Sequence, residues 1–70
     1  MTVWEFMEKM GRYEKWRIME NDREVTIEPI SASEVELYGD EEIPINALNA
    51  LELTAEKVDL ENHIIYCTRW

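Results

Sequence analysis

The stretch KWRIMENDREVTIE, residues 15–28, decides the fold because its apolar residues recur at every second position. Asn21-Asp22 interrupts this alternation, and such a pair accommodates the positive φ angles of a tight two-residue turn. The stretch therefore predicts an antiparallel hairpin. Its register has the pairs Ile18–Val25 and Trp16–Ile27 on one face, and Lys15–Glu28, Arg17–Thr26 and Met19–Glu24 on the other.

A short amphipathic helix is predicted over residues 2–10, before the hairpin. Thr2 and Glu5 fit a capping box, in which two side chains satisfy free amides at a helix start. Gly11 follows at the position of a left-handed C-terminal cap. Nine residues form a marginal helix in isolation, so this one is expected to pack on a sheet. Its apolar stripe is Val3, Phe6, Met7 and Met10.

The middle of the chain, residues 31–48, leaves two alternatives open. Val35 and Leu37 alternate with glutamates as in a strand, whereas Ser31 with Glu34 is typical of the first turn of a helix. Further on, Pro44 is compatible with the first position of a short helix.

The C-terminal part of the chain predicts a second hairpin. Residues 51–56 alternate between apolar and polar, and residues 63–70 are rich in β-branched and aromatic side chains. A three-residue loop over 60–62 places Ala55 opposite Cys67, which avoids burying Glu56.

These elements predict a single acidic α+β domain over residues 1–70. We expect an N-terminal amphipathic helix packed on a small antiparallel sheet of four or five strands built from hairpins. A chain of this length buries only about 60% of its unfolded surface, so its net stability is expected to be a few kcal/mol. A homo-oligomer would complete such a small core, and a monomer remains equally open.

Composition excludes several classes of protein. The chain has 16 acidic and 7 basic residues, which gives a formal charge of −9 with His63 neutral, and it is 46% hydrophobic. That apolar content is too high for an acidic disordered tail. No apolar run approaches the roughly 18 residues of a membrane span, and residues 1–5 lack the basic region and the apolar stretch of a signal peptide, so none is expected. One cysteine makes no internal disulfide. A cytoplasmic protein without membrane association is the expectation.

The negative charge is concentrated in the middle of the chain. Residues 24–61 hold eleven acids and one base, whereas residues 1–23 hold five of each. Direct binding to nucleic acid is excluded, because such a surface does not neutralise phosphates. A solvated face is one interpretation, and a docking surface for a basic or nucleic-acid-binding protein is the other. The acidic candidates for that surface are Glu24, Glu28, Glu34, Glu36, Asp40, Glu41 and Glu42.

Residue groups that support catalysis or metal binding are not recognised in the sequence. His63 and Cys67 share one strand face about 13 Å apart, at 3.3 Å per residue, which is too far for a thiolate–imidazole pair. Cys67 is expected in the core and His63 beside a turn. The carboxylates of residues 40–42 lack the spacing and glycine of a calcium loop, and two glycines leave no phosphate-binding loop. We therefore expect no enzyme activity, cofactor or metal site.

Aromatic and sulfur-containing side chains are the remaining binding candidates. Trp16 is expected in the core with Ile18. Trp4, Met19 and Trp70 are the anchor candidates, since exposed tryptophan dominates protein interfaces.

The order of elements resembles small, uncharacterised proteins of phages and integrated mobile elements of Gram-positive bacteria. The likeness is carried by the Thr2-Val3 opening, the charged hairpin, IPINAL at residues 43–48 and ENHIIYCTR at residues 61–69. It implies a mobile-element origin and no catalytic residue. It also implies host-factor inhibition of an anti-CRISPR or anti-restriction type as a second hypothesis.

The sequence thus predicts a non-enzymatic acidic protein that acts by protein–protein binding. One alternative is a nucleic-acid-mimicking inhibitor that uses the acidic candidates. The other is a small structural or assembly module that oligomerises through an aromatic patch.

Overall fold

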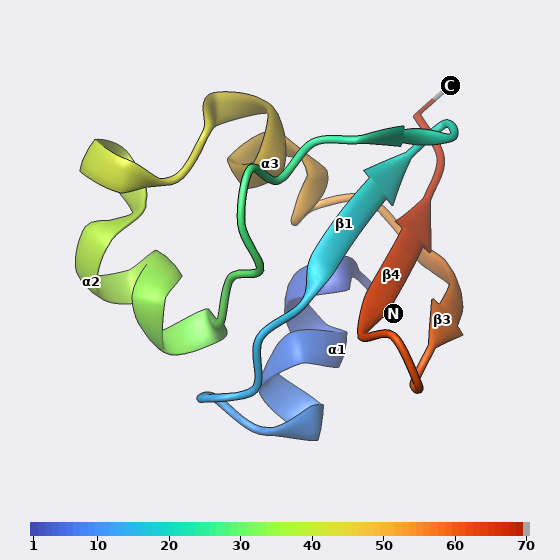
Figure 1. The fold of residues 1–70 in the computed structure, drawn as a ribbon, viewed down its shortest axis with the longest axis horizontal. Coiled ribbons are helices and arrows are strands. Elements are labelled where there is room, and N and C mark those ends of the chain that lie inside the picture. The colour runs from blue at the N-terminus through green and yellow to red at the C-terminus, as the bar shows by residue number, and fades with distance from the viewer. Residues whose placement is uncertain (70) are drawn as a thin grey trace.

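The computed structural model describes residues 1–69, and Asp40 by its backbone only. Three helices and a four-stranded mixed sheet form an α+β fold (Figure 1). The elements in chain order are α1 (Val3–Met10), β1 (Arg17–Glu20), β2 (Arg23–Glu24), α2 (Ala32–Glu42), α3 (Ile45–Ala50), β3 (Ala55–Asp59) and β4 (Ile64–Cys67).

Helix α1 starts with the predicted capping box. The Glu5 amide donates to the Thr2 hydroxyl at 3.1 Å, and the Glu5 carboxylate accepts from the Thr2 amide at 2.8 Å. Val3 and Met7 are fully buried. Gly11 has a φ of +130°, which is positive as expected but lies outside the left-handed helical region.

The first hairpin follows the predicted register only near its turn. Asn21 and Asp22 have φ angles of 50° and 65°, and Met19 pairs with Glu24. The predicted pairs of Trp16 with Ile27, of Arg17 with Thr26 and of Lys15 with Glu28 are wrong. The ladder ends at Glu24, and beyond it the Val25 amide still donates to the Ile18 carbonyl at 3.0 Å. Thr26 is buried instead, and its hydroxyl accepts a hydrogen bond from the Ile18 amide at 3.3 Å.

After Val25 the chain leaves β1 and pairs again at Trp16, the residue that directly precedes this strand. Trp16 pairs with Ile30 in an isolated antiparallel bridge, in which each amide donates to the other carbonyl. Ile27 lies in the unpaired stretch between, with 79% of its surface exposed. The residues after Val25 are therefore shifted relative to the core, and Ile27 faces solvent rather than the buried side.

The sheet is mixed, so the prediction of a purely antiparallel sheet is wrong. Its strand order is β2-β1-β4-β3, and the central strands β1 and β4 are parallel, with Ile18 opposite Ile65. The two outer pairs are antiparallel. A parallel pair needs a long crossover connection. Helices α2 and α3 lie in that connection (Figure 1).

The second hairpin contains the predicted pair Ala55–Cys67, reached by a different route. Val58 pairs with Ile65 rather than with Ile64, because the loop has four residues (60–63) instead of three. A register shift between Ala55 and Lys57 compensates for the extra loop residue.

Residues 31–42 adopt the helical alternative. The Glu34 amide donates to the Ser31 hydroxyl at 3.2 Å, and the Glu34 carboxylate accepts from the Ser31 amide at 3.2 Å. Pro44 then precedes α3 at its N-cap. A strand over 31–40 is therefore wrong, and the helix expected after Pro44 is present.

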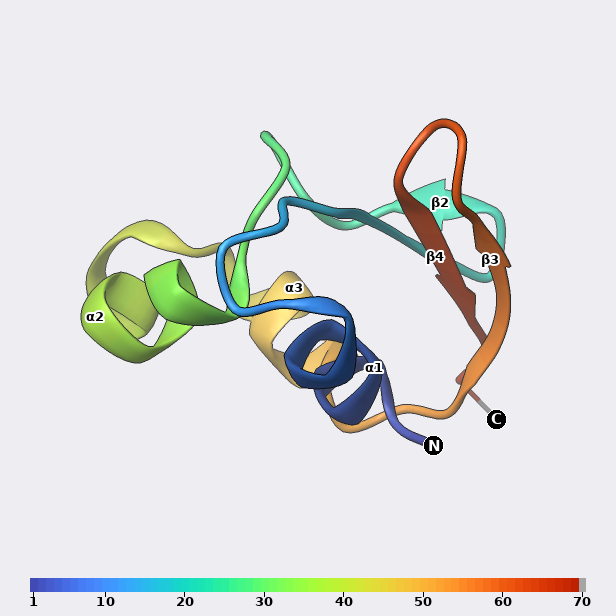
Figure 2. The ribbon, with the colours of Figure 1, turned by 90° about the horizontal axis from the view of Figure 1, so that it is seen from below.

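The buried side chains of α1 and of the sheet belong to one cluster. Met7, Trp16, Ile18 and Ile65 are all within it. Phe6 packs edge-on against the Trp16 ring at 5.2 Å between centroids. In both views α2 lies at the end of the molecule farthest from β3 and β4 (Figures 1 and 2). None of the helices in the described chain is long and apolar enough to cross a bilayer.

Candidate binding site

The acidic candidates lie on three parts of the fold. Glu24 is on β2, and Glu28 is in the connection between β2 and α2. Helix α2 carries the others, and the side chain of Asp40 lies outside the described residues. The members on α2 are Glu34, Glu36, Asp40, Glu41 and Glu42.

Two of these carboxylates form hydrogen-bonded ion pairs with partly exposed arginines of the N-terminal part. Glu24 lies 2.5 Å from the Arg17 guanidinium, and Glu36 accepts hydrogen bonds from both terminal nitrogens of Arg12. The hydrogen bond from Arg17, and then that from Thr26, lowers the pKa of Glu24. The hydrogen bond from Arg12 likewise lowers the pKa of Glu36. These two groups are therefore neutralised within the molecule.

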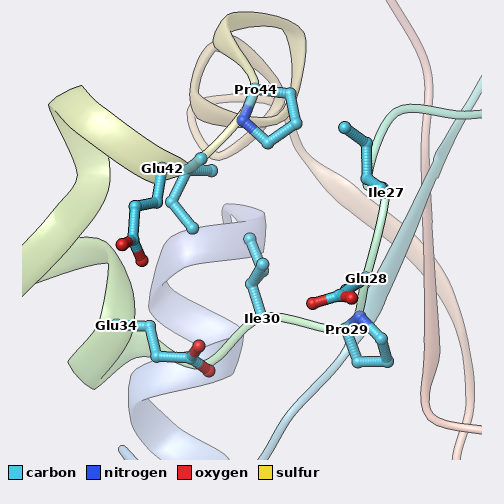
Figure 3. Close-up of a pocket in the computed structure, with 8 residues that line it drawn as sticks. Ile27, Glu28, Pro29, Ile30, Glu34, Glu42 and Pro44 are labelled. Atoms are coloured by element: carbon cyan, nitrogen blue, oxygen red, sulfur yellow. The ribbon is translucent and has the colours of Figure 1, made fainter.

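A surface cavity brings three other carboxylates together. Glu28, Glu34 and Glu42 border a cavity of about 180 Å³ between the connection 27–30, the two ends of α2 and the start of α3. Figure 3 shows the three carboxylates placed around the Ile30 side chain. The apolar lining of the cavity consists of Ile27, Pro29, Ile30, Ile43 and Pro44.

Local sequence fixes the walls of the cavity. Ile30 lines the cavity and is only 4% exposed. Its backbone is held in place by the hydrogen bonds to Trp16 in the isolated bridge. Pro29 and Pro44 have restricted φ angles and stiffen two segments that contribute to the wall. The capping box orients Glu34, whose Oε1 accepts from both the amide and the hydroxyl of Ser31. The site is thus largely preformed.

Few cations balance the charge at this cavity. The Nζ atom of Lys15 lies 3.5 Å from Oε1 of Glu34. Among the described side chains, neither Glu28 nor Glu42 has an ion-pair partner. Apolar side chains line the cavity beside these carboxylates, of which Glu28 and Glu42 are exposed to solvent. The cavity therefore favours a positively charged group that also has apolar surface.

A metal ion does not fit the described acids. No three of the described His, Cys, Asp and Glu side chains lie close enough to hold one ion. Glu34 and Glu42 lie near the two ends of α2, and Glu28 lies across the cavity from them (Figure 3).

Two of the three anchor candidates are only partly exposed in the structure. Trp4 and Met19 are each half-buried, and Trp70 lies outside the described residues. Trp4 packs against the core and borders an apolar groove of about 440 Å³ with Val35, Leu48 and Leu51.

The strongly exposed apolar residues were not among the sequence candidates. Ile27 and Ile45 are 79% and 67% exposed, and Ile45 directly follows Pro44 of the cavity wall. Alternation predicted Ile27 in the core, so the only local signal against burial was the nearby Pro29. Other exposed members of this class are Tyr13, Leu37 and Leu60.

His63 and Cys67 have separate structural roles. The His63 ring stacks on Trp16 at 4.4 Å between centroids, and its Nδ1 lies 2.9 Å from the Lys15 carbonyl oxygen. Cys67 is 3% exposed, as predicted for a core residue, and its thiol donates to the Met19 carbonyl at 3.5 Å. Burial, with a smaller effect of Glu20, raises the pKa of the thiol to about 11. Cys67 is therefore protonated at neutral pH and a poor nucleophile.

Comparison of the chain with protein-family models, with curated proteins and with solved structures found no match in any of the three.

Proposed function

We propose that this protein acts by binding another protein, and that a basic segment of that partner docks at the cavity bordered by Glu28, Glu34 and Glu42. The supporting observation is that three carboxylates border one surface cavity that also has an apolar lining. Binding at the protein's exterior, rather than catalysis, is the proposed mode of action.

Two features beside the cavity favour a polypeptide as the ligand. Ile27 and Ile45 extend the apolar surface beyond the cavity, so a partner gains apolar contacts beside the carboxylates. An apolar centre with a polar rim is typical of protein interfaces. The net charge of −9 also attracts basic partners over a distance and raises their association rate.

Nucleic-acid mimicry has weaker support. A mimic needs a row of free carboxylates at phosphate-like positions, but Glu24, Glu34 and Glu36 each contact a basic side chain of this chain. The remaining described candidates are Glu28, Glu41 and Glu42. An aromatic oligomerisation patch has less support, because Trp4 is half-buried beside its groove and the exposed Tyr13 and Tyr38 lie outside α1.

The proposal is tested by titrating the protein with a nine-residue peptide in which leucine alternates with lysine and arginine. We expect amide chemical-shift changes centred on residues 27–30, 34 and 42–44. Affinity should fall steeply as ionic strength rises from about 0.01 M to about 0.5 M, because exposed charges become screened.

A matched pair of triple variants separates the cavity from net charge. E28Q/E34Q/E42Q removes the cavity carboxylates, whereas E52Q/E56Q/E61Q removes three exposed carboxylates that border no part of it. Glutamine at position 34 retains the capping box. We expect the first variant to lose most of the binding and the second to retain it. Equal losses in both would show only nonspecific attraction and overturn the proposal.

A further inference from the structure

We infer that the outer edge of β3 pairs with the same edge of a second copy of this chain, so that the two sheets join around a twofold axis at Val58. This inference goes beyond the proposed function, because it concerns the end of the molecule farthest from α2 (Figures 1 and 2). The observations that carry it are the unpaired edge of β3 and the order of charges along that edge.

Strand β3 is an edge strand with one side open. It is the last strand in the order β2-β1-β4-β3, so among the described strands it pairs only with β4. The first part of its open side is used by the chain itself, because the Ala55 amide donates to the Met1 carbonyl at 2.9 Å and Thr2 pairs with Thr54. This bridge is antiparallel, so the edge already accepts an antiparallel segment. Beyond it, residues 56–59 offer unpaired backbone groups to another strand.

The opposite edge of the sheet is less suited to pairing. Strand β2 has only the two residues Arg23 and Glu24, and very short edge strands resist the addition of another strand. Strand β3 has five residues, and its open stretch is bounded by Met1 at one end and by the turn 60–63 at the other. A second strand therefore has room for only a few residue pairs.

The charges along the open stretch select one arrangement of two copies. A twofold axis normal to the sheet keeps the helices of both copies on one side and centres on one residue of β3. An axis at Lys57 would place two lysines opposite each other, and an axis at Asp59 would place two aspartates opposite each other. Like charges directly opposite are unfavourable. With the axis at Val58, Lys57 of each copy lies opposite Asp59 of the other, which gives two pairs of opposite charge.

Both charged side chains lie on the face of the sheet away from the core. The Nζ atom of Lys57 is 4.9 Å from the centre of the Tyr66 ring, and Asp59 shares this face because strand residues alternate. Oδ1 and Oδ2 of Asp59 accept from the backbone amide and the side-chain amide of Asn62 at 3.0 Å and 2.9 Å. These hydrogen bonds lower the pKa of Asp59. Its carboxylate is therefore charged at neutral pH and held in place before a partner arrives.

The opposite face contributes apolar contact. Val58 packs against the core and lies opposite Val58 of the other copy in this arrangement. Leu60 directly follows the strand and is 60% exposed, so its burial favours association. The small number of residue pairs and the net charge of −9 on each copy limit the affinity. We therefore expect a weak dimer that forms at high protein concentration.

Charge reversal tests the pairing, with self-association measured by sedimentation equilibrium. Lys57→Glu should weaken the dimer about tenfold, because both attractive pairs become repulsive. The matched control Lys9→Glu changes the net charge equally at an exposed residue of α1, and should weaken the dimer much less. Equal weakening by the two variants would show that net charge alone controls association and would overturn the inference. A pure monomer of the unchanged protein at its highest soluble concentration would also overturn it.

Mixing two variants gives a sharper test. Asp59→Lys should lose self-association as Lys57→Glu does, since its pairs join two lysines. A mixture of the two restores both pairs of opposite charge, so we expect a mixed dimer with an affinity close to that of the unchanged protein. Absence of association in a mixture of the two folded variants would overturn the inference.

Cysteine cross-linking tests the register without a change of charge and without altering the turn at Asp59. Val58→Cys places two cysteines directly opposite each other, within the range of a disulfide. Leu60→Cys is the matched control on the same face, with its two cysteines about 13 Å apart at 3.3 Å per residue. We expect the first variant to form the linked dimer faster, although Leu60 is the more exposed position. Faster linking through position 60 would overturn the register and the inference with it.

Discussion

The sheet region and the α2 region differ in how they use their side chains. Around β1 and β4, Ile18 and Ile65 are fully buried and share one cluster with residues of α1. From residue 33 to residue 46, by contrast, no described hydrophobic side chain is fully buried. The first region supplies stability, and the second presents charge and apolar surface to solvent. Regions with few buried contacts open most readily and commonly carry binding sites.

The largest expected difference between the regions is in core truncation. Trp16 is 1% exposed and contacts both Phe6 and His63. Trp16→Ala should cost about 3–5 kcal/mol, against a total of about 3–10 kcal/mol for a chain of this length. Urea unfolding followed by circular dichroism measures this change in the free energy of unfolding.

The matched substitution in the α2 region is Leu37→Ala, at a side chain that is 70% exposed. We expect a change within about 0.5 kcal/mol. Comparable losses at the two positions would contradict the division of the molecule into a packed part and an exposed part.

The second-largest expected effect is the contribution of Cys67 to the pH dependence of the free energy of unfolding. Its pKa is raised from 9.0 to about 11 in the folded state by burial, so folding favours the protonated thiol. This contribution is fully present below pH 9 and is lost as pH rises from about 9 to about 11. The slope approaches at most about 1.4 kcal/mol per pH unit.

Urea unfolding at several pH values in that window measures the slope, and Cys67→Ala serves as the control because it removes the thiol. We expect a flatter profile for the variant. A rapid reaction of native Cys67 with a thiol reagent at pH 8 would be inconsistent with burial of the group.

The third effect compares the two helix caps. Thr2 caps α1 and Ser31 caps α2, and each belongs to a complete capping box. Substitution of either residue by alanine should cost about 1 kcal/mol. Because α2 has few buried contacts, Ser31→Ala should mainly speed amide hydrogen exchange within α2, while Thr2→Ala should lower global stability. Uniform acceleration of exchange by Ser31→Ala would show that α2 unfolds only with the sheet.

Local signals account for the parts of the fold that the sequence predicts well. The capping box at Thr2 and the turn at Asn21-Asp22 depend on residues no more than three positions apart. The pair Ala55–Cys67 was predicted because burial of Glu56 is unfavourable. In each case the decisive interaction lies close in the chain or within one hairpin.

Long-range pairing explains what could not be predicted. The parallel contact of β1 with β4 joins Ile18 to Ile65, and no local pattern records such a partner. The outward position of Ile27 follows from the hydrogen bond between Thr26 and the Ile18 amide, which alternation alone does not reveal. A period of two shows that residues share a face, but it does not show where a ladder ends.

The same limit applies to the candidate site. The sequence placed Glu28, Glu34 and Glu42 among seven acidic candidates without separating them from Glu24 and Glu36. The separation depends on Arg12 and Arg17, and Arg12 lies 24 positions from its partner Glu36. Only the folded chain shows which carboxylates are neutralised and which border the cavity.

The smallest expected effect distinguishes paired from unpaired carboxylates. Glu36→Gln removes the contact with Arg12 and should lower stability slightly, since exposed pairs contribute little. Glu42→Gln removes a charge with no ion-pair partner among the described side chains, so we expect stability to stay unchanged or to rise slightly through reduced repulsion.

The pKa of Glu36 is lowered in the folded state, so the contribution of Glu36 to stability is present above the unfolded pKa and is lost as pH falls through the folded pKa. Thermal unfolding at pH 7 and at successively lower pH should therefore separate the two variants at pH 7 and bring them together as the pH falls through the folded pKa of Glu36. A larger loss for Glu42→Gln than for Glu36→Gln at pH 7 would show that the cavity carboxylate stabilises the fold rather than standing free for a partner.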